Sequence, residues 1–442
     1  MGWLSSLILA LMAFVFYRKD GKLYSPAVLF SALWSVLCLL SSMQLYGLYG
    51  VSDFAFACIL LGVIGFAFGC LLADRLKFRN RNISIDLSNK RYILLIALCL
   101  VGVWMNIQFI MKFITSGFDI SMIYILMAQT VSGDATELTD LYSSSNIVIQ
   151  QYLGYPLLYT IIPISISKYI EEKKKKYLWM AIILFLIRFL FDIRRTVIVI
   201  LAVFLIFYLY IRRKEKGLNR REYGLFKWFK RLSFKKKIFV LVPVVFLLLT
   251  FSLLSAIRSG DDGGDYSLFS NFYFYYAASL AYFSERLNML SNLEYTFGLT
   301  SFRGLFAPFF AIAEMIGFGK PYLMSVANDN VDSLHATILE ISPQGTFNSY
   351  ATSFFEFYLD GGVMGLIIIS VIFGYISNLL YRKMVFYKTE RYMWKYSYWV
   401  SIFIYLSVLH FNAVVVCYVW PFVIERIFYT KQRRSLIHSS IK

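Results

Sequence analysis

The chain has 442 residues, of which 59% are hydrophobic and 16% are charged, and its formal net charge is +18. A soluble domain carries about 25% charged residues, so a chain this apolar is expected to be an integral membrane protein. Apolar runs of roughly 16–20 residues favour helices over the alternating strands of a barrel. Most of the basic excess lies in short segments between these runs. That is the positive-inside pattern, and it argues against nucleic acid as the partner.

The apolar runs predict about 11 transmembrane helices, with the N-terminus outside and the C-terminus inside. The predicted spans, in chain order, are 3–17, 26–46, 54–73, 92–115, 148–167, 177–192, 196–211, 238–257, 362–381, 397–411 and 412–429. The chain therefore divides into three parts. These are a transmembrane bundle at 1–257, a large outer segment at 258–361, and a last part at 362–442 with three spans and a cytoplasmic tail.

Residues 258–361, the polar segment, differ from the rest of the chain because they are rich in polar and aromatic residues. Two apolar stretches inside the segment, 268–283 and 304–319, are short for a span of about 20 residues. We expect them to lie at the membrane interface or to be re-entrant. If both cross the membrane as a hairpin instead, the topology is unchanged and the count rises to about 13 spans. The polar segment is expected to act on a lipid-linked substrate at the outer face.

Four charged residues stand where two predicted spans meet on the outer side: Arg188, Asp192, Arg194 and Arg195. Arg188 and Asp192 are four residues apart and can pair on one helical face, which a structural role explains as well as function does. Arg194 and Arg195 break the positive-inside bias. A guanidinium matches phosphate oxygens and does not lose its charge. We therefore predict a clamp for a lipid phosphate or diphosphate, with a structural ion pair as the alternative.

Five residues of the polar segment are candidates for binding or chemistry. Arg258 lies at the end of a predicted span, and Arg286 and Arg303 flank the two apolar stretches. The alternative for each arginine is a salt bridge with a carboxylate of the segment. His335 is the candidate general base, although a lone histidine is more often structural. Glu340 completes the candidate catalytic set.

A third feature lies just before the ninth predicted span. Glu356 and Asp360 are four residues apart and can orient an arginine or a sugar hydroxyl. Gly361, Gly362 and Gly365 follow, and we expect them to let the span approach a neighbouring helix closely. Most aromatic residues of the polar segment are expected to pack in the core or anchor at the interface, and some to stack on sugar rings.

The layout of many spans with one large outer loop late in the chain resembles the oligosaccharide repeat-unit polymerases, the O-antigen polymerases of the Wzy type. Arg194-Arg195-Thr196 at the start of a span and the stretch 359–365 add to the likeness. The resemblance implies a GT-C-like membrane fold in the bacterial inner membrane, with a periplasmic N-terminus and a cytoplasmic C-terminus. It also implies polymerisation of undecaprenyl-diphosphate-linked repeat units. In that family an arginine that begins a span holds the diphosphate, and Arg194 and Arg195 match it.

The O-antigen ligases are broader relatives with a His-Asn pair shortly before the final glycine motif. Here Phe347-Asn348 stands at that place and His335 is out of register, which argues against a ligase. The expected partners are the lipid-linked oligosaccharide, membrane lipids, a chain-length regulator and a flippase. The alternatives are a flippase or other transporter of lipid-linked oligosaccharide, which would need polar residues deep in several spans, and a non-enzymatic scaffold.

The expected chemistry needs no cofactor. The lipid diphosphate is an activated leaving group, so transfer needs positive charge on the diphosphate and a base for the acceptor hydroxyl. No Walker A or HExxH motif appears in a suitable context. The five cysteines fall inside apolar runs, so neither a disulfide nor a metal site is predicted.

Overall fold

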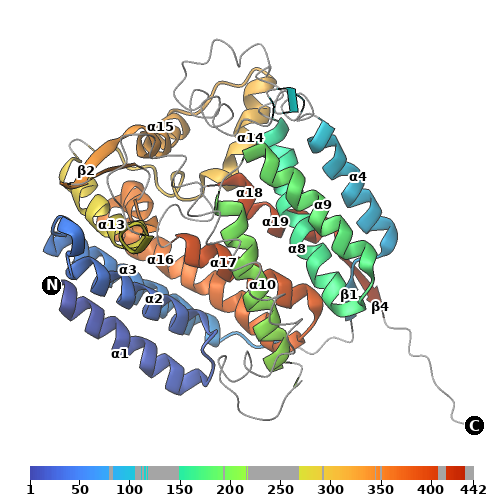
Figure 1. Cartoon of the computed structure of the whole chain (residues 1–442), viewed down its shortest axis with the longest axis horizontal. Helices are drawn as coiled ribbons and strands as arrows, with labels where there is room; N and C mark the ends of the chain where they lie inside the picture. Colours follow the sequence, from blue (N-terminus) through green and yellow to red (C-terminus); the bar gives the residue numbers. More distant parts are fainter. Residues whose placement is uncertain are drawn as a thin grey trace, which may run out of the picture. The chain divides into compact units, whose positions relative to one another are not determined.

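The computed structural model describes residues 1–78, 83–104, 111, 114–115, 117, 149–192, 195–215, 217, 268–290, 293–343, 345–348, 351–406 and 415–433. This part of the chain is mostly helical, with two short antiparallel ribbons (Figure 1). Three of its helices are long and apolar enough to cross a membrane: α1 (Gly2–Asp20), α3 (Asp53–Asp74) and α16 (Ser353–Tyr387). A mostly helical architecture with three candidate membrane spans is thus confirmed for the described residues, while the count of about 11 spans stays a prediction.

The chain packs into two compact units. Unit 1 contains Met1–Arg75, Arg194–Val385 and Tyr396–Val415. Unit 2 contains Leu76–Ile193, Phe386–Lys395 and Val416–Lys442. Unit 1 therefore combines portions of all three parts predicted from the sequence, and it holds the whole polar segment.

In unit 1, α1 and α2 (Pro26–Ser42) run side by side in opposite directions (Figure 1). The short helix η1 (Leu45–Gly47) follows α2, and α10 (Arg195–Glu215) also belongs to this unit. Helix α17 (Glu390–Leu406) contributes its part from Tyr396 onward. Buried aromatic rings fill the core between α2, α3 and α16. Phe30 stacks on Phe66 with ring centroids 4.1 Å apart, and Trp34 lies 4.5 Å from Phe354.

Glycines allow α3 and α16 to touch backbone to backbone. A Cβ atom at Gly69 would lie 2.0 Å from the carbonyl oxygen of Val371, and one at Gly374 would lie 1.9 Å from that of Phe66. Any larger residue at either position would force the helices apart. The close helix contact predicted for Gly361 and its neighbours is therefore made elsewhere along α16.

Gly361 and Gly362 instead break α16 into two helical parts. Gly362 has φ +60°, a left-handed conformation that glycine adopts without steric cost. No described atom lies within 4 Å of the position that a Cβ at Gly361 would take. The break falls where the ninth span was predicted to begin, but the helix before the break already starts at Ser353.

The polar segment forms three helices and a ribbon before it enters α16. The helices are α13 (Leu268–Asn288), α14 (Arg303–Met315) and α15 (Tyr322–Ala336). Strands β2 (Ile338–Ser342) and β3 (Gly345–Asn348) pair antiparallel, with Ile338 opposite Asn348. Helix α13 is largely buried and packs against α2 and α3. Helix α13 also contacts β2, so it connects the ribbon to α2 and α3.

Unit 2 contains α4 (Asn89–Trp104), the π-helical turn η2 (Gln150–Gly154), α8 (Tyr155–Glu172) and α9 (Lys175–Asp192). Helices α8 and α9 run side by side in opposite directions (Figure 1). The last predicted span is broken at Trp420 into α18 (Val416–Val419) and α19 (Pro421–Phe428). Strands β1 (Ile83–Asp86) and β4 (Thr430–Arg433) pair antiparallel, with Ile83 opposite Arg433.

Candidate anion-binding site

Arg286 lies near the end of α13 with its guanidinium group buried, and the residue is 9% exposed. Its Nη1 donates to Thr337 Oγ1 (2.5 Å) and its Nη2 donates to Ser333 Oγ (3.2 Å). Its carbon Cζ lies 5.3 Å from the ring centroid of Phe355. Within the described part of the chain, Arg286 forms no salt bridge, and its buried Nε has no hydrogen-bond partner. The buried positive charge therefore meets only neutral groups, which leaves much of its desolvation cost uncompensated.

The two hydroxyls that hold Arg286 are fixed by their own hydrogen bonds. Thr337 Oγ1 donates to the carbonyl oxygen of Ser333 (2.7 Å), and Ser333 Oγ donates to that of Asn330 (2.8 Å). Tyr282 of α13 also donates to the carbonyl oxygen of Thr337 (2.9 Å). Because both hydroxyl protons are committed to carbonyl groups, the oxygen lone pairs are available to accept from Arg286. The guanidinium is thus held in one orientation without being neutralised.

The turn at residues 296–302 is held by the buried carboxylate of Asp360. The donors to its two oxygens are Thr296 Oγ1 (2.6 Å), Gly298 N (2.8 Å), Thr300 N (3.0 Å) and Ser301 N (2.9 Å). Convergent donors of this kind compensate a buried carboxylate. In place of the predicted contact with an arginine or a sugar hydroxyl, Asp360 fixes the backbone that leads directly into Arg303.

Arg303 begins α14 and contacts a different part of α15 from Arg286. Its Nε donates to Asn328 Oδ1 (2.7 Å). No salt bridge joins Arg303 to a carboxylate among the described residues. Asn330 Nδ2 donates to Thr300 Oγ1 (3.3 Å), which ties α15 to the turn before Arg303. Both arginines of the polar segment that the structure describes are thus anchored to α15 by neutral groups.

The candidate carboxylates Glu340 and Glu356 lie in different environments. Glu340 is exposed on β2, where its Oε1 accepts from the hydroxyl of Tyr49 (2.8 Å). The hydrogen bond to Glu340 raises the pKa of Tyr49. Tyr49 N also donates to the carbonyl oxygen of Ile341 (2.9 Å), so the turn after α2 is joined to the ribbon. Glu356 is fully buried in α16. The structure therefore gives Glu340 a contact with Tyr49 and with neither arginine.

Three candidates of the polar segment have no described side chain. His335 lies in the last turn of α15, between the two residues that bind Arg286, and only its backbone is described. Asn348 ends β3, again with only its backbone described. Arg258 lies outside the described residues. Their roles stay predictions.

The predicted diphosphate clamp falls on the connection between α9 and α10. Helix α9 ends at Asp192 and α10 begins at Arg195, so the short connection is as predicted. The side chains of Asp192 and Arg195, and the whole of Arg194, lie outside the described part of the structure. The clamp itself therefore stays a prediction.

Arg188 lies on α9 in unit 2 and is buried. Its Cζ lies 4.0 Å from the ring centroid of Tyr155 and 5.1 Å from that of Tyr159, both on α8. A guanidinium over aromatic faces is a favourable cation–π arrangement. Arg188 therefore helps to hold α9 against α8, and its predicted pairing with Asp192 falls outside the described side chains.

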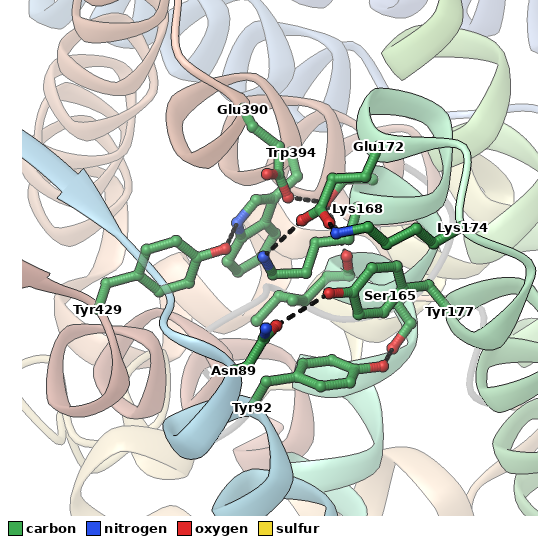
Figure 2. A network of polar contacts seen from close by, with 12 residues as sticks. Asn89, Tyr92, Ser165, Lys168, Glu172, Lys174, Tyr177, Glu390, Trp394 and Tyr429 are labelled. Atoms are coloured by element: carbon green, nitrogen blue, oxygen red, sulfur yellow. Dashed lines mark hydrogen bonds and ion pairs between the residues drawn. The ribbon is translucent and has the colours of Figure 1, made fainter.

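Unit 2 contains a polar network whose buried cation has a carboxylate partner (Figure 2). Buried Lys168 donates to Glu172 Oε1 (3.2 Å), and Lys174 donates to Glu172 Oε2 (2.8 Å). Ser167 donates to Glu390 Oε1 (2.7 Å). Burial acts to raise the pKa of Glu172, but the hydrogen bonds from Lys174 and Lys168 outweigh it and the pKa is lowered. This network is self-compensated, and we assign it a structural role.

A second buried cluster in unit 2 centres on Glu425 of α19. Its carboxylate is fully buried and pairs with Arg391 through one oxygen and with Lys395 through the other, at 2.8 Å for Lys395. Both cations belong to the start of α17. Each charge in the cluster has an opposite charge beside it, so the cluster joins α17 to α19 and needs no ligand.

Sequence reasoning missed the residues that position Arg286. Ser333 and Thr337 lie 47 and 51 residues after it in the chain, so no local pattern joins them to Arg286. The signal in the sequence is that Ser333 and Thr337 are four residues apart, two on each side of His335, a spacing that places two hydroxyls on one helical face. Within the described part of the chain, no group of three or more His, Cys, Asp and Glu residues could hold a metal ion.

Comparisons with protein-family models, with curated proteins and with solved structures found no match to this chain. Its function therefore has to be inferred from its residues and their geometry.

Proposed function

We propose that this protein is a membrane glycosyltransferase that polymerises undecaprenyl-diphosphate-linked oligosaccharide repeat units on the periplasmic face of the bacterial inner membrane. The observation that supports the proposal best is the buried guanidinium of Arg286, which contacts hydroxyls and a ring but no carboxylate among the described residues. Burial of a charge without an opposite charge is costly to the fold. A bound anion would supply the missing negative charge, and the diphosphate of the lipid carrier is such an anion.

The proposed reaction transfers the growing chain from its lipid carrier to an incoming repeat unit. The bond between the anomeric carbon and the diphosphate oxygen breaks, and its electron pair stays on the released undecaprenyl diphosphate. A new bond forms between the anomeric carbon and an acceptor hydroxyl oxygen, whose proton goes to a base. Arg286 would stabilise the charge that develops on the diphosphate, with Arg303 as a second cation. His335 remains the candidate base.

Both substrates of such a reaction carry a lipid diphosphate, so the reaction needs two anion sites. In the proposal, Arg286 and Arg303 serve one diphosphate. The connection with Arg194 and Arg195, supported by Arg188, Asp192 and Arg258, serves the other. Glu340, Glu356, Asp360 and Asn348 complete the site as catalytic or supporting residues. The proposed fold is GT-C-like with about 11 spans, and a flippase and a chain-length regulator would work beside it.

The function is tested in cells that lack their own copy of the gene and carry a plasmid-borne variant. Arg286→Gln keeps a polar side chain of similar length and removes the charge. We expect the surface polysaccharide on a gel to change from long chains to single repeat units, because the repeat unit is still exported and attached. Arg75→Gln, which removes an exposed arginine of unit 1, should keep long chains. Full-length polymer with Arg286→Gln would contradict the proposal, and loss of even the single repeat unit would favour a flippase.

A further inference from the structure

Phe297 combines a strained backbone with an exposed ring. It lies in the turn at 296–302 with φ +52°, and its side chain is 80% exposed. A bulky residue is a genuine outlier at positive φ, where glycine or asparagine is the usual choice. A phenyl ring exposed on the protein surface also lacks the stabilisation that burial inside the protein would give. Neither feature stabilises the folded protein, which points to a role in binding.

The backbone on both sides of Phe297 is fixed by Asp360. Phe297 N donates to the carbonyl oxygen of Asp360 (3.0 Å), and Gly298 N donates to Asp360 Oδ1 (2.8 Å). The side chain of Thr296 is fully buried and bonded to the same carboxylate (2.6 Å). The turn therefore holds the Cα–Cβ bond of Phe297 in one direction. A ring held in this way is preorganised for a ligand with a flat apolar face.

Groups that suit a sugar lie close to Phe297 in the chain. Glu294 is exposed, and its Oε2 accepts from the hydroxyl of Tyr322 (2.6 Å), a bond that raises the pKa of Tyr322. An ionised carboxylate offers about four lone-pair sites, so Glu294 can accept further hydroxyl donors. Tyr295, next in the chain, is partly exposed. The short stretch from Glu294 to Phe297 thus contains an exposed carboxylate and two exposed aromatic rings.

We infer that Phe297 is a carbohydrate-binding platform, on which the ring of a pyranose stacks through its C–H face while Glu294 accepts from the sugar hydroxyls. This inference rests on the proposed function, and it assigns the sugar portion of the lipid-linked substrate to this turn. A glycan fits better than the lipid bilayer as the occupant. An interfacial anchor needs an apolar side chain but no fixed direction, and a neighbouring carboxylate opposes insertion.

Three variants separate the roles that Phe297 can have. Phe297→Gly removes the ring and relieves the positive φ, Phe297→Leu keeps an apolar side chain without the ring, and Phe297→Trp keeps a ring. The probe is the repeat-unit oligosaccharide, released by mild acid from the lipid-linked pool of the expressing strain and free of diphosphate. Its affinity for the purified full-length protein is measured in detergent, together with the midpoint of thermal unfolding.

We expect Phe297→Gly and Phe297→Leu to weaken oligosaccharide binding about tenfold, the effect of losing an aromatic contact of about 1.4 kcal/mol. Phe297→Trp should bind as the wild type does, and Phe297→Gly should unfold at the same or a higher temperature. Wild-type binding by Phe297→Leu would overturn the inference in favour of a membrane anchor. A lower unfolding temperature for Phe297→Gly would overturn it in favour of a structural role.

The polymer assay distinguishes failure of this inference from failure of the proposed function. If Arg286→Gln abolishes long chains while all Phe297 variants make them, the platform is wrong and the function stands. If Arg286→Gln still makes long chains, the proposed function is wrong. Arg75→Gln, which changes an exposed arginine outside the proposed site, should bind the probe as the wild type does, and this serves as the control.

Discussion

Buried charges are compensated in different ways in two regions of this protein. In unit 2, Glu425 lies between Arg391 and Lys395, and every charge of the cluster has an opposite neighbour. In the polar segment, Arg286 is equally buried but is held by the hydroxyls of Ser333 and Thr337. Burial alone therefore does not distinguish a functional charge from a structural one. A buried carboxylate with a cation at each oxygen joins helices, whereas a buried cation without a counter-ion among the described residues is a candidate for binding an anion.

The largest effect on stability is expected at the cluster of Glu425, Arg391 and Lys395. Glu425→Gln leaves buried Lys395 and partly buried Arg391 without their counter-charge, and removal of one partner from such a cluster costs about 3–5 kcal/mol. The free energy of unfolding, measured with denaturant in detergent, should fall by that amount. Glu314→Gln, which changes an exposed glutamate, is the control and should change it little. An unchanged value for Glu425→Gln would show that the cluster is not structural.

At Arg286, substitution is expected not to lower the free energy of unfolding. Arg286→Gln removes a buried charge that has no counter-ion among the described residues, so the unfolding free energy should stay the same or rise. Polymer synthesis should fall by about 10²–10³-fold, the usual cost of losing one group that stabilises a developing anion. Both quantities are measured on the same preparation. A variant that is strongly destabilised would place Arg286 with the structural charges and remove the contrast between the two regions.

A smaller effect is expected at Asp360, which is compensated by hydrogen bonds in place of opposite charges. Asp360→Asn places an amide donor against the backbone of the 296–302 turn, and one unsatisfied buried donor costs about 1–3 kcal/mol. Because this turn leads into Arg303, polymer yield should also fall. The exposed residue Asp332 provides the control variant Asp332→Asn. Wild-type stability for Asp360→Asn would show that the carboxylate does not stabilise the 296–302 turn.

The smallest effect concerns Glu172, whose pKa is lowered in the folded protein. A lowered pKa means that the ionised form stabilises the fold above the unfolded-state pKa of about 4.3, and that this contribution is lost as the pH falls through the folded-state pKa. Its side chain is 30% exposed, so we expect less than about 1 kcal/mol. Glu172→Gln should therefore flatten the acid limb of the curve of unfolding free energy against pH. An identical curve for variant and wild type would show that the pair contributes nothing.

Apolar runs placed one connection of the fold correctly. The connection between α9 and α10 lies between Asp192 and Arg195, as predicted, because apolar runs end on both sides of these charged residues. The ninth span was predicted to begin at residue 362, whereas α16 already begins at Ser353 and is broken at Gly361 and Gly362, a break that was not predicted. The connection depends on local composition, which the sequence displays directly.

The geometry of the candidate site depends on contacts between distant residues, which the sequence does not display. Arg286 was identified as a candidate, but its hydroxyl partners come from another helix of the polar segment. The β2–β3 ribbon was not predicted, and neither was the strained turn at Phe297, because each is formed by long-range packing and hydrogen bonding. The hydrogen bonds to Asp360 join residues about 60 positions apart, and a local sequence pattern cannot predict contacts at that separation.

The central claim is that Arg286 binds an anionic lipid group, and equilibrium binding tests it most directly. The affinity of the purified protein for a short-chain polyprenyl diphosphate is compared with its affinity for the same polyprenol without the diphosphate, for wild type and for Arg286→Gln. We predict that the wild type prefers the diphosphate and that Arg286→Gln loses about tenfold or more of that preference, the effect of a charge-assisted hydrogen bond of about 1.5–3 kcal/mol. An undiminished preference in Arg286→Gln would contradict the account.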